Sequence, residues 1–253
     1  MNRPKALIFD VDGTLADTER DGHRVAFNRA FEEAGLNWHW DVGSYGRLLN
    51  VAGGKERIRY FIEAYHPDFG MPGNTDEWID QLHQSKTRHY LALMDAGAIP
   101  LRPGVRRLLL EARGAGLRLA IATTSTIGSV TALLNTTLGP ESVNWFECIA
   151  AGDIVPNKKP APDIYLYAID RMNLSPADCL AFEDSGNGLL SSSRAGLKTV
   201  VTVNGYTRHQ DLDEAVIVLD QLGEPGTPFE VLRGHATGAT YVNIALIESL
   251  FRD

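Results

Sequence analysis

The sequence predicts an α/β protein in which a doubly wound, Rossmann-like parallel sheet carries an inserted all-helical domain. Short apolar runs alternate with amphipathic stretches of helical period, a pattern typical of right-handed βαβ crossovers. A long segment after the first apolar run has helical patterns throughout. With 253 residues, of which 44% are hydrophobic, the chain is long enough to bury a large core.

The first expected strand covers residues 5–10 (KALIFD). This run is short and mainly apolar, and a glycine follows it at position 13, as is typical of a buried parallel strand. Further strands are expected at 117–123, 146–151, 178–182 and 197–203. Helices are expected at 104–115, 127–138, 162–172, 188–195 and, at the end of the chain, 242–251. Ligands of such sheets bind at the carboxyl ends of the strands, so the polar residues that follow each strand are the candidates for function.

The segment 17–95 breaks the alternation, because its patterns, such as RVAFNRAFEEAG and KERIRYFIEAY, are all helical. We therefore expect a helical cap domain at 17–95 and a catalytic core formed by 1–16 and 96–253. The segment from residue 223 is rich in Gly, Pro and Thr and suggests no function.

Composition limits the class of partner. The chain has 24 basic and 32 acidic residues and a formal charge of −8, which disfavours binding to a nucleic-acid backbone. An anionic small molecule remains possible if a local basic pocket or a bound cation receives it. Cys148 and Cys179 lie in apolar runs, and neither a signal peptide nor a membrane span is visible. We expect a cytoplasmic monomer without membrane partners.

The sharpest motif is DVDGT at residues 10–14, directly after the first strand. Asp10 and Asp12 are two residues apart in extended chain, so their carboxylates share a face, and Gly13 permits a sharp turn. Two acids so close repel each other unless a cation accompanies them. An isolated DxD would be read as a solvated turn, but further polar residues end other expected strands or stand just before a helix. These are Thr123, Lys159 (in KKPAPD), Glu183 and Asp184.

The ordered set resembles the motifs of the haloacid dehalogenase-like superfamily of phosphatases along essentially the whole chain. The resemblance implies that Asp10 is the nucleophile and that Asp12 is the general acid and base. It also implies that Thr123 hydrogen-bonds the transferring phosphoryl group and that Lys159 offsets its charge. The implied cofactor is Mg²⁺, with Asp10, the main-chain carbonyl of Asp12, Asp184 and Glu183 as ligands.

Neighbouring residues extend this site. We expect the main-chain N–H groups of Thr124 and Ser125 to bind phosphoryl oxygens, and Asn187 to contact the substrate or to order Glu183. Lys158 is expected to be a solvated lysine. Dehalogenases and transport ATPases that resemble this group lack an Asp at the third position of the motif, so Asp12 favours phosphate-ester chemistry.

The cap is expected to choose the substrate, since the catalytic groups contact mainly the phosphoryl group. A Gly-Gly turn opens a basic helix there, and an ordinary solvated helix surface is an equally good interpretation of these charges. The residues expected to bind substrate are Glu19, Gly54, Lys55, Arg57 and Lys86. With AGD at 151–153 and KKP at 158–160 they resemble the CbbY-type subgroup, which implies a sugar bisphosphate such as xylulose-1,5-bisphosphate.

Gly22 stands where relatives of that subgroup commonly have a His near the hinge, and on an α-helix the adjacent His23 would face in another direction. The alternatives are therefore a general sugar-phosphate or phosphoglycolate phosphatase and a β-phosphoglucomutase-like mutase. A protein that binds a phosphorylated ligand without catalysis is disfavoured, because a sensor has no use for the proton-handling Asp12.

Overall fold

The computed structural model describes residues 3–51, 53–70 and 73–252, and the chain forms two compact units. One unit is Met1–Asp17 with Pro100–Asp253, and the other is Thr18–Ile99. The sequence placed the insert at 17–95, so its start differs by one residue and its end by four.

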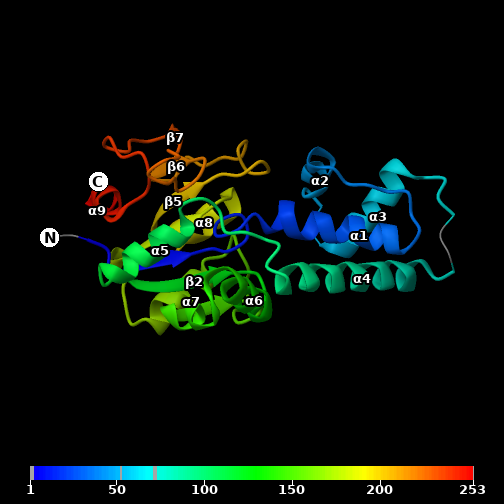
Figure 1. Ribbon diagram of the computed structural model, residues 1–253, viewed down its shortest axis with the longest axis horizontal. Helices are drawn as coiled ribbons and strands as arrows, with labels where there is room; N and C mark the ends of the chain where they lie inside the picture. Colours follow the sequence, from blue (N-terminus) through cyan, green and yellow to red (C-terminus); the bar gives the residue numbers. More distant parts are fainter. Residues whose placement is uncertain (1–2, 52, 71–72, 253) are drawn as a thin grey trace. The chain divides into compact units, whose positions relative to one another are not determined.

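Seven described strands form one sheet in the first unit, in the order β3-β2-β1-β4-β5-β6-β7 (Figure 1). Neighbours from β3 to β6 are parallel, and β7 pairs antiparallel with β6. This confirms the predicted fold class. The strands are Ala6–Phe9 (β1), Arg118–Thr123 (β2), Phe146–Ala151 (β3), Cys179–Glu183 (β4), Lys198–Thr202 (β5), Ile217–Leu219 (β6) and Val231–Arg233 (β7).

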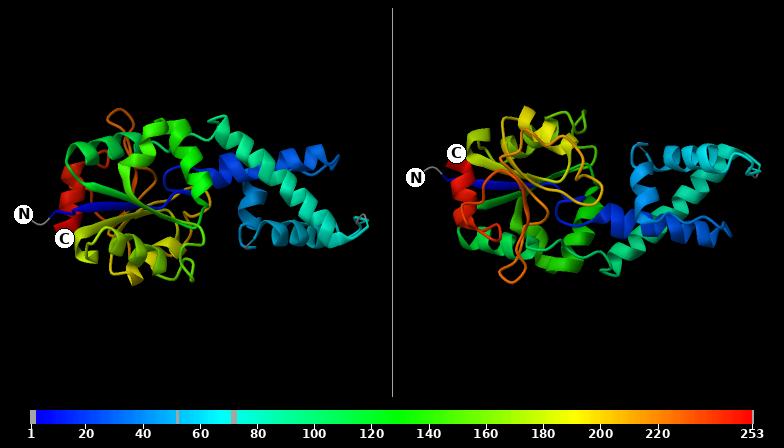
Figure 2. Two further views of the ribbon diagram at one scale, coloured as in Figure 1. Left: turned by 90° about the horizontal axis from the view of Figure 1, so that it is seen from below. Right: turned by 90° about the horizontal axis from the view of Figure 1, so that it is seen from above.

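Helices cover both faces of this sheet, as right-handed crossovers require: α5 and α6 lie on one face, and α7 and α8 on the other (Figure 2). Alternate strand residues such as Ala6, Ile8 and Ala120 pack against Tyr165 and Ile169 of α7. The helices are Val105–Gly114 (α5), Ile127–Leu138 (α6), Asp163–Arg171 (α7), Gly186–Arg194 (α8) and Ile244–Arg252 (α9), with 3₁₀ turns at Pro140–Trp145 (η2) and Pro176–Asp178 (η3).

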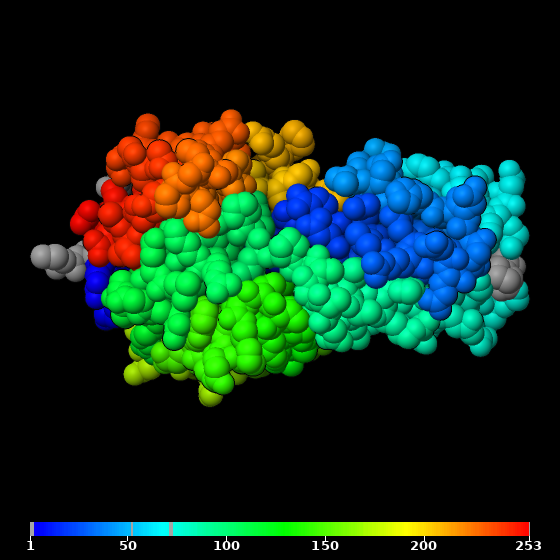
Figure 3. All heavy atoms as spheres, viewed as in Figure 1, coloured from blue at the N-terminus to red at the C-terminus, as the bar shows by residue number. Residues whose placement is uncertain are grey.

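The C-terminal segment packs along the surface of the core unit, where Figure 3 shows it in orange to red. Arg107 of α5 holds it, because its guanidinium pairs with Glu224 at 3.0 Å and donates to the main-chain oxygens of Gly223 and Val242. The guanidinium also lies 4.5 Å from the centre of the Tyr241 ring. Strands β6 and β7 were not predicted, since each has three residues and their pattern is too short to read.

The second unit contains helices and no strand among its described residues. Its core is aromatic: Trp40 contacts Phe27, Phe31 and Phe61 at centroid distances of 4.6, 4.8 and 5.2 Å. Its elements are a π turn at Thr18–His23 (η1) and the helices Arg24–Glu33 (α1), Val42–Leu48 (α2), Gly54–Tyr65 (α3) and Thr75–Asp95 (α4). Across the described residues, no helix has the combination of length and apolarity needed to cross a bilayer.

Candidate active site

Asp10 follows the central strand β1 and is 7% exposed. Its main-chain N–H donates to the oxygen of Phe182 at 3.0 Å, so the parallel pairing of β1 with β4 continues to this residue. The pairing brings the end of β4 beside Asp10. As a result, oxygen atoms of Asp10, Glu183 and Asp184 lie within 4.8 Å of one another.

This acidic cluster is buried, which makes its charge costly. Burial raises the pKa of Asp184 well above its usual range, and the charges of Asp10 and Glu183 raise it further. Burial also raises the pKa of Glu183, although Lys159 opposes the rise. Buried carboxylate oxygens within reach of one atom are the donors that Mg²⁺ takes in proteins. The donor set fits the magnesium ion that the resemblance implies.

Lys159 is the cation of the cluster. Its ammonium donates to Asp10 Oδ1 at 2.7 Å and to Glu183 Oε1 at 2.6 Å, and its side chain is 8% exposed. Burial alone would lower the pKa of Lys159, but the two carboxylates outweigh it and raise the pKa above the ordinary value, so the ammonium stays charged. Lys158, by contrast, pairs with exposed Asp153 at 2.7 Å and points to solvent.

The ends of β1 and β2 meet at the same edge. Ser125 Oγ donates to Asp12 Oδ2 at 2.6 Å, which orients this carboxylate. Thr123 is fully buried, and its Oγ1 accepts a hydrogen bond from the Ser125 N–H at 3.2 Å. Thr124 is exposed, and Ser125 is half-buried. The structure therefore brings Asp10, Asp12, Thr123, Ser125 and Lys159 to the edge where the acidic cluster lies.

Tyr165 also contacts the acidic cluster, although the sequence did not identify it as a site residue. Its hydroxyl donates to Glu183 Oε1, the oxygen that also receives Lys159, and the Lys159 ammonium lies 5.1 Å from the centre of its ring. Burial raises the pKa of this phenol, which therefore remains a donor at neutral pH. No sequence signal distinguished it, because a Tyr on the buried face of a helix looks like a core residue.

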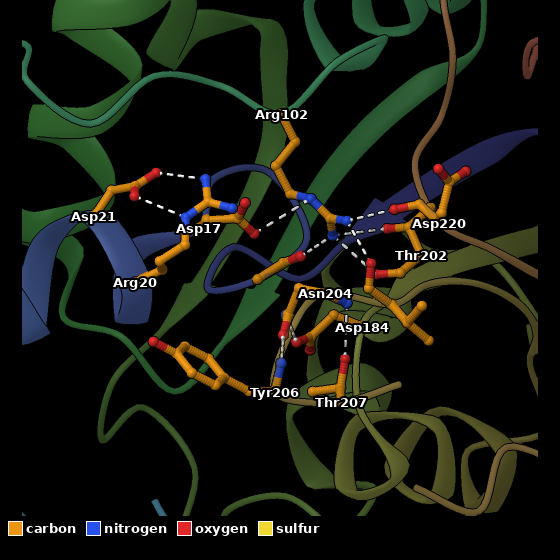
Figure 4. Close-up of polar contacts among 12 residues, drawn as sticks. Asp17, Arg20, Asp21, Arg102, Asp184, Thr202, Asn204, Tyr206, Thr207 and Asp220 are labelled. Atoms are coloured by element: carbon orange, nitrogen blue, oxygen red, sulfur yellow. Dashed lines mark hydrogen bonds and ion pairs between the residues drawn. The ribbon is translucent and has the colours of Figure 1, made fainter. Parts of the chain in front are cut away.

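Arg102 was also missed, and it supports the motif loop (Figure 4). Its guanidinium donates to the main-chain oxygens of Gly13, Thr202, Val203 and Asp220. It also lies 3.4 Å from Asp17 Oδ1. Arg102 thus ties the loop after β1 to the end of β5.

Gly13 shows how tightly this loop is packed. Its φ of 86° belongs to the left-handed region, and a Cβ there would clash with the Asp184 carboxylate and lie 2.7 Å from Asn204 Nδ2. The loop can approach the acidic cluster because this position has no side chain.

Gly22 and His23 lie in a part of the cap unit whose helix type the sequence did not predict. Residues 18–23 form a π turn, which holds one residue more per hydrogen-bonded ring than an α turn and changes the direction of the side chains. His23 stacks on Tyr90 with centroids 4.0 Å apart, and its Nδ1 lies 2.8 Å from Lys86 Nζ. His23 therefore ends a π turn instead of lying in an α turn, and the expectation that it faces away from the position of Gly22 stays a prediction. Gly22 is buried against Ile99 and Tyr90, where a Cβ would clash.

Two of the expected substrate residues are engaged within the cap. Arg57 is 8% exposed and donates to Tyr45 Oη at 3.0 Å and to the main-chain oxygens of Leu48 and Val51. Glu19 accepts a hydrogen bond from Tyr45 Oη at 2.5 Å. These contacts link η1, α2 and α3 into one polar chain.

The remaining residues are placed as follows. Lys86 is 8% exposed, with its ammonium 5.0 and 5.3 Å from the ring centres of Phe27 and Tyr90. Gly54 begins α3, and Lys55 pairs with Asp80 at 2.6 Å on a half-exposed surface. Asn187 is exposed on α8, where it lines a surface hollow with Gln210.

Comparisons with known proteins agree with this geometry. The family model of the haloacid dehalogenase-like hydrolases matches residues 4–196. The plasmid-encoded protein CbbY of Cupriavidus necator is 48% identical over 94% of this chain and 92% of its own length. A phosphorylated carbohydrates phosphatase of Thermotoga maritima is 28% identical over 79% of this chain and 85% of its own.

Among solved structures, a variant of CbbY from Rhodobacter sphaeroides in complex with xylulose-(1,5)-bisphosphate superposes with a TM-score of 0.73. It is 43% identical to this chain, and the match covers 88% of this chain and 96% of that one.

The close packing of Gly13 predicts a stability effect. Gly13→Ala should lower the free energy of unfolding by more than the roughly 1–2 kcal/mol that a left-handed alanine costs, because the new methyl group also displaces Asp184. Gly35→Ala is the matched control, since Gly35 has a φ of 68° and no atom within 4 Å of a Cβ. Urea unfolding of both variants measures the difference, and equal losses would contradict the contact.

The burial of His23 predicts a pH dependence. Burial, with the nearby cations Lys86 and Arg57 and with His83, outweighs the attraction of Glu19 and lowers the pKa of His23 to about 4. The unfolded chain therefore binds the proton first, and stability falls as pH decreases from about 6.5 toward 4. Between pH 7 and pH 5 the wild type should lose about 2 kcal/mol more than His23→Gln. Urea unfolding at both pH values tests this, and exposed His39 gives the control His39→Gln, which should behave as wild type.

Proposed function

Because the chain belongs to the haloacid dehalogenase-like hydrolases, we propose that it is a magnesium-dependent phosphatase of small sugar phosphates that acts through an aspartyl phosphate on Asp10. The observation that carries the proposal is the pairing of Asp10 with Lys159 at 2.7 Å inside the buried acidic cluster. A carboxylate whose orientation is fixed by a neighbouring ammonium is a competent nucleophile toward phosphorus. A merely structural ion pair would not need two further carboxylates within ligand distance.

In the first step Asp10 attacks the phosphorus and the ester oxygen leaves. Asp12 protonates the departing alkoxide, and in the second step it removes a proton from the water that hydrolyses the acyl phosphate. The hydrogen bond from Ser125 to Asp12 Oδ2 at 2.6 Å supports this role, since it fixes the orientation of the carboxylate that handles the proton. The two steps regenerate Asp10 and release inorganic phosphate.

The charge of the phosphoryl group is met by residues of this chain. Lys159 offsets the charge on the phosphoryl oxygens, and the hydroxyl of Thr123 with the N–H groups of Thr124 and Ser125 donates hydrogen bonds to them. Magnesium, when bound, neutralises phosphate charge that would repel the nucleophile. Its proposed ligands are Asp10, Asp184, the main-chain carbonyl of Asp12 and Glu183.

For the substrate we propose a sugar bisphosphate such as xylulose-1,5-bisphosphate, whose second phosphate is bound by Lys55 and Lys86 at Gly54 of the cap. Support comes from the burial of Lys86 and from the CbbY relative whose structure contains that bisphosphate. Glu19 and Arg57 shape this part of the cap through Tyr45. Asn187 remains a proposed contact of the substrate.

The nucleophile is tested by Asp10→Asn. The amide cannot attack phosphorus as a carboxylate does, so turnover of p-nitrophenyl phosphate in the presence of magnesium should fall at least about 10⁴-fold, to background. Asp68→Asn, at an exposed position of the cap, serves as the control and should keep wild-type activity. Activity retained in Asp10→Asn would overturn the assignment.

The substrate class is tested by a panel of sugar mono- and bisphosphates with detection of free phosphate. We expect the highest kcat/KM for a bisphosphate. Lys86→Met should raise KM for that bisphosphate about tenfold or more, because a charged hydrogen bond is worth roughly 1.5–3 kcal/mol, and should leave p-nitrophenyl phosphate hydrolysis unchanged.

Lys158→Met is the control, because Lys158 is exposed and pairs with Asp153. It should leave kcat/KM unchanged for both the bisphosphate and p-nitrophenyl phosphate. Equal rates across the panel would exclude the bisphosphate and favour a general sugar-phosphate phosphatase. Transfer of the phosphoryl group to sugar instead of water would identify a mutase.

A further inference from the structure

Asn204 lies two residues beyond the end of β5, and its side chain reaches the acidic cluster (Figure 4). Its Nδ2 donates to Asp184 Oδ2 at 2.7 Å. This amide is a neutral donor to Asp184, whose carboxylate is repelled by Asp10 and Glu183 and attracted by the cations Arg102 and Lys159. No motif in the sequence pointed to it.

The amide orientation is fixed by the turn that contains it. The Asn204 Oδ1 accepts a hydrogen bond from the Tyr206 N–H at 2.8 Å, and the Asn204 N–H donates to Thr207 Oγ1 at 3.0 Å. Because an N–H group must face the carbonyl end of the amide, the NH₂ end faces Asp184. A flipped amide would lose the hydrogen bond from the Tyr206 N–H and the one to Asp184 Oδ2.

The turn itself is anchored to the motif loop. Arg102 donates to the main-chain oxygens of Thr202 at 2.8 Å and Val203 at 2.6 Å, which directly precede Asn204, and to the oxygen of Gly13. Asn204 Nδ2 also packs closely against Gly13, since a Cβ at Gly13 would lie 2.7 Å from it. The segments on both sides of Asp184 are therefore held in register by one guanidinium.

We propose that Asn204 is a positioning residue for the metal centre: its amide holds Asp184 Oδ2 so that Oδ1 faces the magnesium ion. The inference rests on the magnesium site of the proposed function. Without the amide, repulsion from Asp10 and Glu183 turns the Asp184 carboxylate away from the cluster. Outer contacts of this kind typically change metal affinity 10- to 100-fold.

The test is Asn204→Ser with direct measurement of magnesium binding by calorimetry. A serine hydroxyl still accepts the Tyr206 N–H and keeps the turn, but it is too short to donate to Asp184. The Kd for Mg²⁺ should rise about 10- to 100-fold. Asn204→Ala is the second variant, and the unfolding temperature of each variant in chelator shows that it is folded. The rise in that temperature on adding Mg²⁺ should shrink in both.

Asn144→Ser is the matched control, since Asn144 also donates its amide to a carboxylate, Glu141 at 3.2 Å, on an exposed surface. It should bind Mg²⁺ as wild type does. A lower unfolding temperature with unchanged Kd in the Asn204 variants means that the residue only stabilises the turn, and overturns the inference. Failure of the wild type itself to bind Mg²⁺ would instead overturn the metal site of the proposed function.

Discussion

The structure depends on one electrostatic constraint, the burial of three carboxylates whose oxygens lie within 4.8 Å of one another. Three ionised carboxylates and the ammonium of Lys159 sum to a charge of −2, which a divalent cation balances. Either the cluster takes up protons, as the raised pKa values of Glu183 and Asp184 indicate, or it binds such a cation. A divalent cation such as the proposed magnesium ion would therefore relieve the repulsion within this cluster.

The sheet creates this constraint through its order and register. Strand β1 is central, and its pairing of Phe9 with Phe182 makes Asp10 the neighbour of Glu183. Strand β2 pairs parallel with β1, so its carboxyl end lies at the same edge of the sheet. Thr123, the last residue of β2, therefore lies at this edge although its side chain is short. Parallel strand pairing therefore brings the site residues together. The loop after β1 contributes Gly13, whose positive φ permits the turn beside the acidic cluster.

The resemblance to family motifs identified Asp10, Thr123 and Asp184 in the sequence, and the structure places each of them at or next to the end of a strand. Sequence reasoning could not find Tyr165, Arg102 or Asn204, whose roles come from contacts with distant segments and whose residue types are ordinary in a helix or loop. The π turn at residues 18–23 escaped for another reason, because a helical period in the sequence does not reveal one added residue per turn.

Arg102 and Lys159 are buried cations of the core unit with different acceptors. Arg102 donates to main-chain oxygens, and Lys159 donates to carboxylates of the acidic cluster. Arg102 spreads a planar set of donors over four main-chain oxygens, which suits a rigid joint between loops. Lys159 holds two carboxylates with a compact charge that a phosphoryl group can share without moving the backbone. A lysine in place of Arg102 would have too few fixed donors for these four main-chain oxygens. The choice of cation at each place thus follows from the number and direction of the acceptors around it.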